Sequence, residues 1–349
     1  MFKFKELCLP ANFDQQTFII AEIGQNHQGD INTAKKLIEV AKNCGADCVK
    51  FQKTDLEEKF NARALERPYV SPNSFGETYG EHKAFLEFSE TEFIILQKYA
   101  NELDIIFAAS AMDAHSLKFL AEINVPFIKI GSGDANNYLL IEKAAKTDIP
   151  LIISTGMQTI EAVRKIYKIV SKYHKNFALL HCVSAYPTPY EDINLQVINL
   201  FKEEFPDVAI GYSGHELGTH ITVAAVAMGC KIVEKHITLN KGQKGSDHKC
   251  SLEPHEFKEM VEKIRTLEAA MGRPIKVMQN SELPCYEKLG KTLVYTRDLP
   301  KGHQLHANDL NIKVAEPKGI DGAKFDDVIG KILITEVEKD DSVLTQHLN

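Results

Sequence analysis

The sequence predicts an α/β protein: a (β/α)₈ TIM barrel followed by a small, mostly β domain. Short apolar runs of strand length alternate with segments of helical spacing over most of the chain. The 349 residues exceed one ordinary domain, and the 44% apolar content supports a full core. A doubly wound open sheet is the alternative, but no GxGxxG motif follows the first strand.

The first units set the pattern. Residues 18–23 form an apolar run that ends in Gly24, and Asp30 is placed to cap a helix over 32–41. A second strand is predicted at 46–52. The further strands are predicted at 105–109, 127–130, 151–154, 177–182, 208–212 and 232–236, and the further helices at 90–103, 114–123, 138–146, 160–173, 195–205, 220–228 and 254–271.

One segment, residues 53–89, breaks this rhythm. It is polar, rich in proline and glycine, and carries several basic residues. A stretch this long without regular structure is usually a functional lid or a disordered insert, and both readings stay open.

The pattern changes again after Pro274. Brief apolar runs at 293–295, 310–314, 328–330 and 332–334 are separated by turns, which is typical of a compact β domain. The predicted organisation is therefore a barrel domain over 1–275, a linker over 276–287 and a small domain over 288–349.

Composition excludes several classes of protein. The net charge of −7 provides no field that would attract nucleic acid or acidic lipid, and no run approaches the length of a membrane span. The first residues lack the apolar region of a signal peptide. The seven cysteines, Cys8 among them, show no disulfide or metal spacing, which indicates a reducing, cytoplasmic compartment.

Two histidines end consecutive predicted strands. His215 follows the strand at 208–212 and His236 ends the strand at 232–236. Neighbouring parallel strands deliver these side chains to one mouth, where two imidazoles could hold a divalent metal. Taken alone, the pair is at least as well explained by hydrogen bonds to the local backbone.

Two lysines interrupt apolar strands. Lys50 lies between Val49 and Phe51, and Lys129 lies between Ile128 and Ile130, where an ordinary core would not place an ammonium group. Ammonium groups and hydroxyls at one mouth suit a ligand with a phosphate and a carboxylate. The strand ends carry Glu22, Asn26, His27, Lys50, Gln52, Ser110, Lys129, Ser132, Asp134, Ser154, Thr155, Ser184, Tyr186, Ser213, His215, Glu234 and His236.

Other candidates are weaker on their own. The turns at 131–134 and 154–156 fit anion-binding loops or merely tight connections. Asp247, in a loop after the last strand, fits a sugar contact or acid–base chemistry as well as it fits an exposed loop residue.

Several motifs together resemble the sialic acid synthase family. The resemblance covers nearly the whole chain, and the tail is similar to the antifreeze-like (SAF) domain. The motifs are AEIGQNHQG at 21–29, KFQ at 50–52, KIGSGD at 129–134 with Asn136 and Asn137, STGM at 154–157, Tyr186-Pro187, GYSGH at 211–215 and EKH at 234–236.

The resemblance implies that phosphoenolpyruvate condenses with an N-acylated mannosamine, helped by Mn²⁺ or Mg²⁺. It implies that His215 and His236 bind the metal, which would polarise the sugar aldehyde and could activate water. It makes Glu22 the leading acid–base candidate. Phosphoenolpyruvate would be bound by Lys50, Lys129, Ser132, Ser154, Ser184, Ser213 and Ser110. The family often has Asn at the position of Ser184 and Thr at the position of Ser110. The acceptor sugar would be bound by Gln52, Asp134, Tyr186 and Asp247.

The resemblance also implies a homodimer and leaves open whether it is domain-swapped. Bacterial members place a tail arginine in the partner subunit's sugar site, but the matching segment here, 313–318, has none. That contact is therefore either absent or replaced, with Lys318 as the candidate replacement. Segments 66–69, 79–83 and 316–319 instead resemble the animal-type members, which use N-acetylmannosamine 6-phosphate.

A phosphorylated acceptor needs additional cations. The candidates in the basic segment and the tail are Lys59, Arg63, Arg67, Lys83 and Lys318. The alternatives are an enzyme for unphosphorylated N-acetylmannosamine, a legionaminate or pseudaminate synthase, a more distant heptulosonate-type synthase, and an ice- or carbohydrate-binding protein with an inactive barrel.

Overall fold

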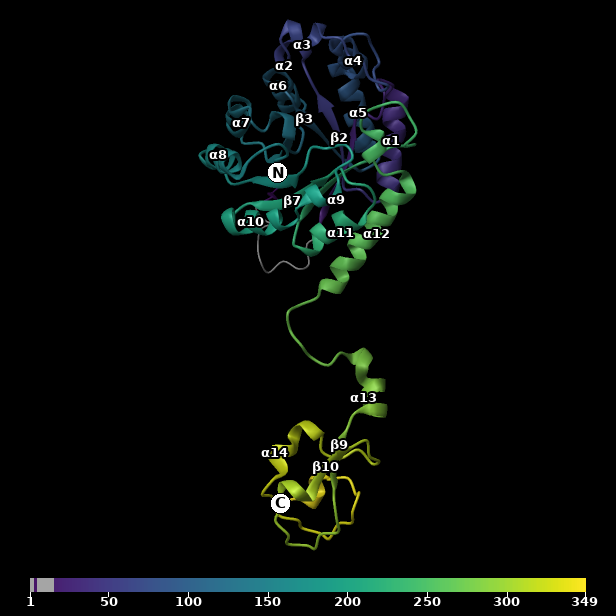
Figure 1. Cartoon of the computed structure of the whole chain (residues 1–349), viewed down its shortest axis with the longest axis vertical. Coiled ribbons are helices and arrows are strands. Elements are labelled where there is room, and N and C mark those ends of the chain that lie inside the picture. The colour runs from purple at the N-terminus through teal and green to yellow at the C-terminus, as the bar shows by residue number, and fades with distance from the viewer. Residues whose placement is uncertain (1–2, 5–15) are drawn as a thin grey trace. The chain divides into compact units, whose positions relative to one another are not determined.

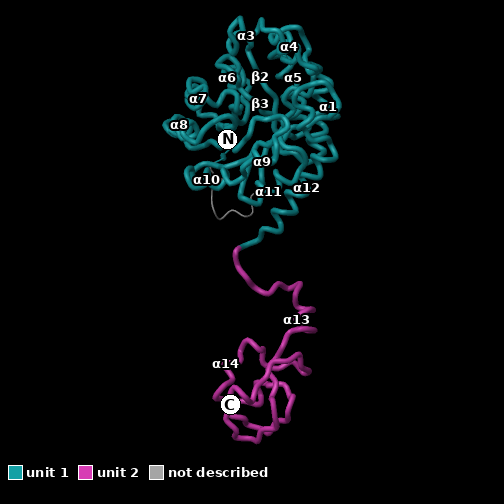
Figure 2. Tube along the Cα trace, in the orientation of Figure 1, with its two compact units in different colours: residues 1–273 teal, residues 274–349 magenta. Residues whose placement is uncertain are grey.

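A computed structural model describes residues 3–4 and 16–349 of the chain. Cys8 and most of the first residues, which are predicted to lack the apolar region of a signal peptide, lie outside the described residues. The chain divides into two compact units, residues 1–273 and 274–349 (Figure 2). Across the described part of the chain, no helix combines the length and the apolar character needed to cross a membrane.

The first unit is built on a closed barrel of parallel strands surrounded by helices (Figure 1). Because β1 pairs with both β2 and β8, the sheet closes on itself, which confirms the barrel and rules out the open doubly wound sheet. The strands are β1 (Phe18–Gly24), β2 (Cys48–Lys53), β3 (Ile106–Ala111), β4 (Ile128–Ile130), β5 (Leu151–Ser154), β6 (Phe177–Cys182), β7 (Ala209–Gly214) and β8 (Ile232–His236).

The helices begin where the sequence places capping residues. Asp30 accepts hydrogen bonds from the N–H groups of Asn32 and Thr33 at the start of α1, and Pro254 opens the long closing helix. The helices around the barrel are α1 (Ile31–Asn43), α5 (Glu90–Glu102), α6 (Ala114–Glu122), α7 (Tyr138–Ala145), α8 (Ile160–Ser171), α9 (Tyr190–Ile193), α10 (Gln196–Glu204), α11 (His220–Ala227) and α12 (Pro254–Met271).

The barrel interior is divided into an apolar floor and a polar mouth. Side chains alternate along a strand, so Phe18, Ile20 and Glu22 of β1 all face inward at successive levels. Phe4, which precedes β1 in the chain, also belongs to the floor. Its side chain is fully buried, and its ring packs edge-on against that of Phe127, with 5.6 Å between the ring centroids. The floor consists of Phe4, Phe18, Ile20, Cys48, Ala108, Phe127, Ile152, Ala178, Leu180, Ala209 and Ile232.

The segment after β2 is folded. It contains α2 (Leu56–Lys59), α3 (Ala62–Glu66) and α4 (Tyr79–Leu86), which lie together in Figure 1. Thr78 and Glu81 form a capping box at the start of α4, and Tyr79 packs edge-on against Phe60 at 5.5 Å. The segment therefore forms an ordered cap rather than a disordered insert, held by aromatic contacts between helices too short to show periodicity.

The second unit has its own small core, in which β9 (Thr292–Tyr295) pairs antiparallel with β10 (Leu310–Lys313). It also contains α13 (Leu283–Leu289) and α14 (Phe325–Val328). The runs expected as strands at 328–330 and 332–334 are not strands: Val328 ends α14, and Ile332 and Leu333 make only isolated bridges. Val328 and Leu333 are buried singly while Ile329 and Ile332 are exposed, so short apolar runs here reflect core contacts without strand pairing.

Candidate active site

Strand register brings the predicted residues to one level of the barrel mouth. Glu22 lies opposite Lys50 on one side and opposite His236 on the other. Ser110 lies opposite Lys129, and Ser213 lies opposite Glu234. Because the strands are parallel and in this register, their carboxyl ends assemble a single polar layer above the apolar floor.

Four charged side chains of alternating sign form this layer. The Lys50 ammonium lies 2.5 Å from Glu22 Oε2 and 3.6 Å from Glu234 Oε1, and the Lys129 ammonium lies 3.0 Å from Glu234 Oε2. No side chain of the four is more than 5% exposed. We call Glu22, Lys50, Glu234 and Lys129 the charged layer; its charges balance in the absence of any ligand.

Burial and pairing perturb these groups in different directions. Burial raises the pKa of Glu22, against the opposing effect of Lys50. Burial acts on Glu234 in the same way, but the two lysines overcome it and lower the pKa of Glu234 to about 2. Burial lowers the pKa of Lys129. Glu234 is thus fixed as the carboxylate of the layer, whereas Glu22 is the group closer to exchanging a proton at neutral pH.

Glu22 also lies close to Gly24 at the end of β1, where other polar side chains converge. Gln52 Nε2 donates to Glu22 Oε1 at 2.9 Å. A Cβ atom placed on Gly24 would lie 3.1 Å from Glu22 Oε1, 3.3 Å from Gln52 Nε2 and 3.5 Å from Asp247 Oδ2. Three of the residues predicted for acid–base work or sugar binding therefore face one small space around Gly24, which we call the Gly24 space.

Serine hydroxyls gather on the opposite side of the mouth, around Gly156. The Gly156 N–H donates to Ser132 Oγ at 3.0 Å, and a Cβ atom on Gly156 would lie 2.7 Å from that oxygen and closer still to Ser184 Oγ. Among the described residues, the buried hydroxyls of Ser154 and Ser184 have no hydrogen-bond partner. Buried hydroxyls without a protein partner are suited to donate to a ligand, and we call the hydroxyls of Ser132, Ser154 and Ser184 the serine cradle.

The two predicted metal ligands lie side by side. The rings of His215 and His236 are 5.3 Å apart between centroids, and Tyr186 packs against His215 at 4.1 Å. His215 Nδ1 donates to the Val183 carbonyl at 2.8 Å, which leaves Nε2 as the free nitrogen. Thus one ring nitrogen does bond to the backbone, as the structural alternative expects, and the other remains available.

His236 is suited to bind a cation. Its buried Nδ1 has no hydrogen-bond partner in the described chain and lies 3.7 Å from Asp247 Oδ2. Burial lowers the pKa of His236, so the ring is neutral, the form that binds metals. These two nitrogens fit a divalent metal with open positions, although no set of three His, Cys, Asp or Glu side chains in residues 3–4 and 16–349 forms a metal site.

A buried network supports the loop after β7. Lys235 and Glu216 are fully buried and pair at 2.9 Å, and Tyr212 and Thr222 both donate to the Glu216 carboxylate. Glu216 directly follows His215, so this network fixes the backbone from which the imidazole projects.

Some residues at the strand ends have structural partners. Asn26 donates to the Ile237 carbonyl and to Ser251, and His27 stacks on Phe88 at 4.1 Å. Asp134, predicted to bind the sugar, lies at the end of β4, but its carboxylate pairs with Lys59 of α2 at 3.1 Å. Its evident contact is with the cap.

Glu234 is the residue that sequence reasoning left without a role. It joins both lysines of the charged layer, and Ser213 donates to it at 3.4 Å. A signal was present, because a glutamate beside Val233 in a buried strand is as unusual as the lysines in β2 and β4.

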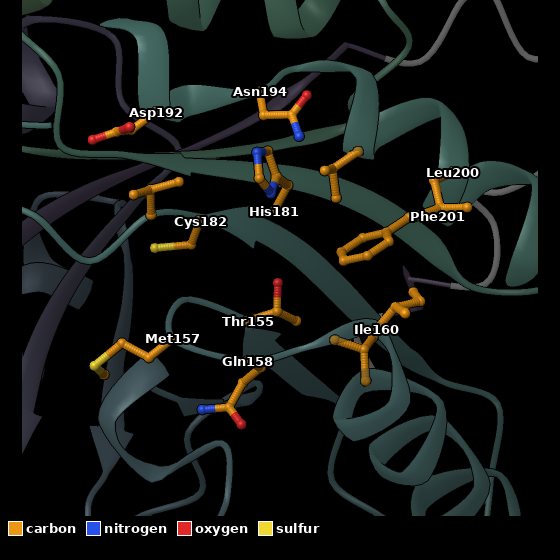
Figure 3. A pocket seen from close by; sticks show the side chains of 13 residues that line it. Thr155, Met157, Gln158, Ile160, His181, Cys182, Asp192, Asn194, Leu200 and Phe201 are labelled. Carbon is orange, nitrogen blue, oxygen red and sulfur yellow. The ribbon is translucent and has the colours of Figure 1, made fainter. Parts of the chain in front are cut away.

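A pocket of about 310 Å³ lies beside the residues that follow β5 and the end of β6 (Figure 3). Thr155, Cys182, His181 and Asn194 are among its lining residues, and Ile160 and Phe201 contribute apolar side chains.

Comparisons with known proteins agree with this geometry. The chain matches the NeuB family over residues 37–276 and the SAF domain over residues 290–349. It is 52% identical to the N-acetylneuraminate-9-phosphate synthase of Homo sapiens, over 94% of this chain and 92% of that protein. It is 50% identical to the protein of the same name from Drosophila melanogaster, over 94% of each.

A solved structure is also similar. The N-acetylneuraminic acid synthetase of Leptospira borgpetersenii shares 34% identity with a TM-score of 0.69, over 79% of this chain and 92% of that chain. The family match, the closed barrel and the tail sheet support the same assignment. The chain therefore belongs to the NeuB family of sialic acid synthases and carries a carboxy-terminal SAF domain.

Proposed function

We propose that the protein condenses phosphoenolpyruvate with N-acetylmannosamine 6-phosphate to give N-acetylneuraminate 9-phosphate and phosphate. The observation that carries this proposal is the charged layer, which lies between unpartnered serine hydroxyls on one side and the Gly24 space on the other. An anion and a polyol can thus be held next to each other. The high identity to animal N-acetylneuraminate-9-phosphate synthases supports the phosphorylated acceptor.

Phosphoenolpyruvate occupies the lysine side of the mouth in this proposal. The ammonium groups of Lys50 and Lys129 neutralise its carboxylate and phosphate, and the serine cradle donates hydrogen bonds to them. Because these ammonium and hydroxyl donors are already in place before the ligand binds, little free energy is spent on reorganising them. The proposed ligands are Lys50, Lys129, Ser110, Ser132, Ser154, Ser184 and Ser213.

His215 and His236 would hold the divalent metal, Mn²⁺ or Mg²⁺. The bound ion would supply Lewis-acid polarisation of the acceptor aldehyde. Gln52, Tyr186 and Asp247 would orient the sugar beside it, and Asp134 would act through its contact with Lys59.

The chemistry proceeds in two stages. The carbon–carbon bond forms from C3 of phosphoenolpyruvate to the aldehyde carbon, whose oxygen gains a proton while positive charge develops at C2. The fixed carboxylate of Glu234 stabilises that charge electrostatically. Glu22 is the acid–base group, because burial raises its pKa and its Oε1 faces the Gly24 space.

Water then adds to C2 and loses a proton to a base. The C2–O bond of the tetrahedral intermediate breaks and inorganic phosphate departs with the bridging oxygen, while the remaining C2 hydroxyl gives its proton to the departing phosphate and becomes the C2 ketone. The oxygen that bridges C2 and phosphorus therefore leaves with the phosphate, which is the mark of C–O rather than P–O cleavage.

The test measures phosphate release with Mn²⁺ and phosphoenolpyruvate, offering N-acetylmannosamine and its 6-phosphate separately. Preference for the 6-phosphate is expected. Phosphoenolpyruvate labelled with ¹⁸O in the C2–O bridge should place the label in the released phosphate. Preference for the free sugar would overturn the acceptor, and label retained in the sugar product would overturn the C–O cleavage.

We also propose a cytoplasmic homodimer. The reduced state suits the described thiols, including buried Cys182 next to Ser132. Val314 lies in the tail segment 313–318, which matches the family's partner-contacting region; it is 55% exposed and is available for subunit contact. Light scattering of the purified chain tests the dimer, and a monomeric mass would refute it.

A further inference from the structure

The structure distinguishes among the lysines and arginines of the two units that could bind a second phosphate. Lys59 is paired with Asp134 at 3.1 Å, and Lys53 is paired with Glu87 at 2.5 Å. Arg67 stacks on the Tyr79 ring at 4.1 Å. Lys318 of the tail donates to two carbonyls of its own unit, at 2.8 and 2.7 Å. These cations already have partners, which limits their availability to an incoming anion.

Lys83 differs from them. It projects from α4 and is partly buried. Within the described part of the chain its ammonium group donates one hydrogen bond, to Gln25 Oε1 at 3.1 Å, and lies 5.7 Å from the centre of the Tyr79 ring, farther than Arg67. No carboxylate of the described residues lies within 4.0 Å of the Lys83 ammonium group. Burial lowers the pKa of Lys83, with Asp247 and Glu87 opposing this effect from a distance. An ammonium group held in this way gains from an added anion.

Further positive charge gathers at the same place. The Lys244 ammonium lies over the Phe75 ring at 4.8 Å, and Phe75 stacks with His82 at 5.9 Å. Burial lowers the pKa of His82, and Lys83 and Lys244 add to the effect. Lys83 and Lys244 both lie near His82, and neither forms an ion pair with a carboxylate among the described residues. The positive charge at this place is therefore complementary to a doubly charged anion.

The position of Lys83 connects it to the acceptor. Its partner Gln25 directly follows Gly24, and Asp247, which borders the Gly24 space, acts on Lys83 electrostatically. A sugar whose aldehyde lies beside His236 would therefore extend its far carbons toward the cap. We propose that Lys83 is the specificity-determining residue for the acceptor: its ammonium group binds the 6-phosphate, and Lys244 supplies a second positive charge. This inference rests on the proposed function.

The experiment compares kcat/KM for N-acetylmannosamine 6-phosphate and for N-acetylmannosamine in the wild type and in Lys83→Gln. Losing a charged hydrogen bond to phosphate should lower the 6-phosphate to free-sugar ratio of kcat/KM by about 10- to 100-fold. Lys83→Arg should recover part of that ratio, because it restores the charge. Lys118→Gln is the matched control, since Lys118 is an exposed lysine of α6 outside the cap; its ratio should match the wild type.

Each outcome is informative. If the wild type prefers the 6-phosphate but Lys83→Gln keeps the wild-type ratio, the role of Lys83 is wrong and the proposed function stands. Equal losses for both sugars would make Lys83 a structural residue and also overturn the inference. If the wild type prefers the free sugar, the proposed acceptor fails, and the phosphate site fails with it.

Discussion

Gly156→Ala should weaken the binding of phosphoenolpyruvate strongly while it lowers the stability of the barrel only moderately. The added Cβ would lie 2.7 Å from Ser132 Oγ and closer still to Ser184 Oγ, well inside the roughly 3.5 Å of ordinary contact. Both hydroxyls belong to the serine cradle, so the methyl group must displace them or occupy the ligand's place. Each lost hydrogen bond to an anion costs about 1.5–3 kcal/mol.

Displacing both hydroxyls therefore raises KM for phosphoenolpyruvate by about 100-fold or more. Overpacking should cost about 1–3 kcal/mol of unfolding free energy, which leaves a folded enzyme to assay. The measurements are steady-state KM for phosphoenolpyruvate at saturating acceptor, and urea unfolding followed by circular dichroism.

Gly133→Ala is the matched control, because a Cβ at Gly133 meets nothing within 4 Å. Its KM should stay close to that of the wild type. A Gly156→Ala enzyme whose KM rises less than about threefold would refute the placement of the ligand between these hydroxyls.

Three further predictions follow from buried charges and the histidine pair. Glu234→Gln removes the carboxylate shared by two lysines and should lower the unfolding free energy by about 3–5 kcal/mol, measured by urea titration; a loss below about 1 kcal/mol would contradict the charged layer. His236→Ala should abolish stoichiometric Mn²⁺ binding by mass spectrometry, whereas exposed His220→Ala should retain it. Burial alone would raise the pKa of Asp309 in the tail, but hydrogen bonds led by the one from His303 lower it to about 2. Because this folded pKa lies below the ordinary value of 3.8, the stabilisation of the tail is complete above pH 3.8 and is lost as the pH falls toward 2. The effect should be about 1–2 kcal/mol. Hydrogen exchange of peptides from the tail should show this loss in the wild type and not in Asp309→Asn.

The fold was predictable because apolar runs of strand length alternate with helical patterns along the barrel. The strand β1 illustrates why: all seven of its residues are buried, so both of its faces select apolar side chains and the strand reads as a continuous apolar run. The cap was not predictable, since its helices are as short as Leu56–Lys59 and are held by long-range aromatic contacts. In the tail, single apolar residues such as Leu333 reach the core without forming strands.

The candidate site was predictable as a set of residues but not as a set of contacts. Lys50 and Lys129 are recognisable as lysines inside apolar strands, yet their shared partner Glu234 emerges only from the register of β8 against its neighbours. The cations of the cap look equivalent in sequence. Lys59 differs from Lys83 only because Asp134, distant in sequence, lies beside it.

The apolar floor beneath the charged layer has a kinetic consequence. Phe4 and the inward side chains of the strands close the lower end of the barrel, so reactants and products share one entrance. Lys129 and Ser154 lie deep, at 2% exposure each, whereas Tyr186 stands at the entrance at 47%. If phosphoenolpyruvate binds the lysines as proposed, it would have to enter before the sugar that covers it. The closed floor therefore predicts an ordered addition with phosphoenolpyruvate first, which needs no moving part.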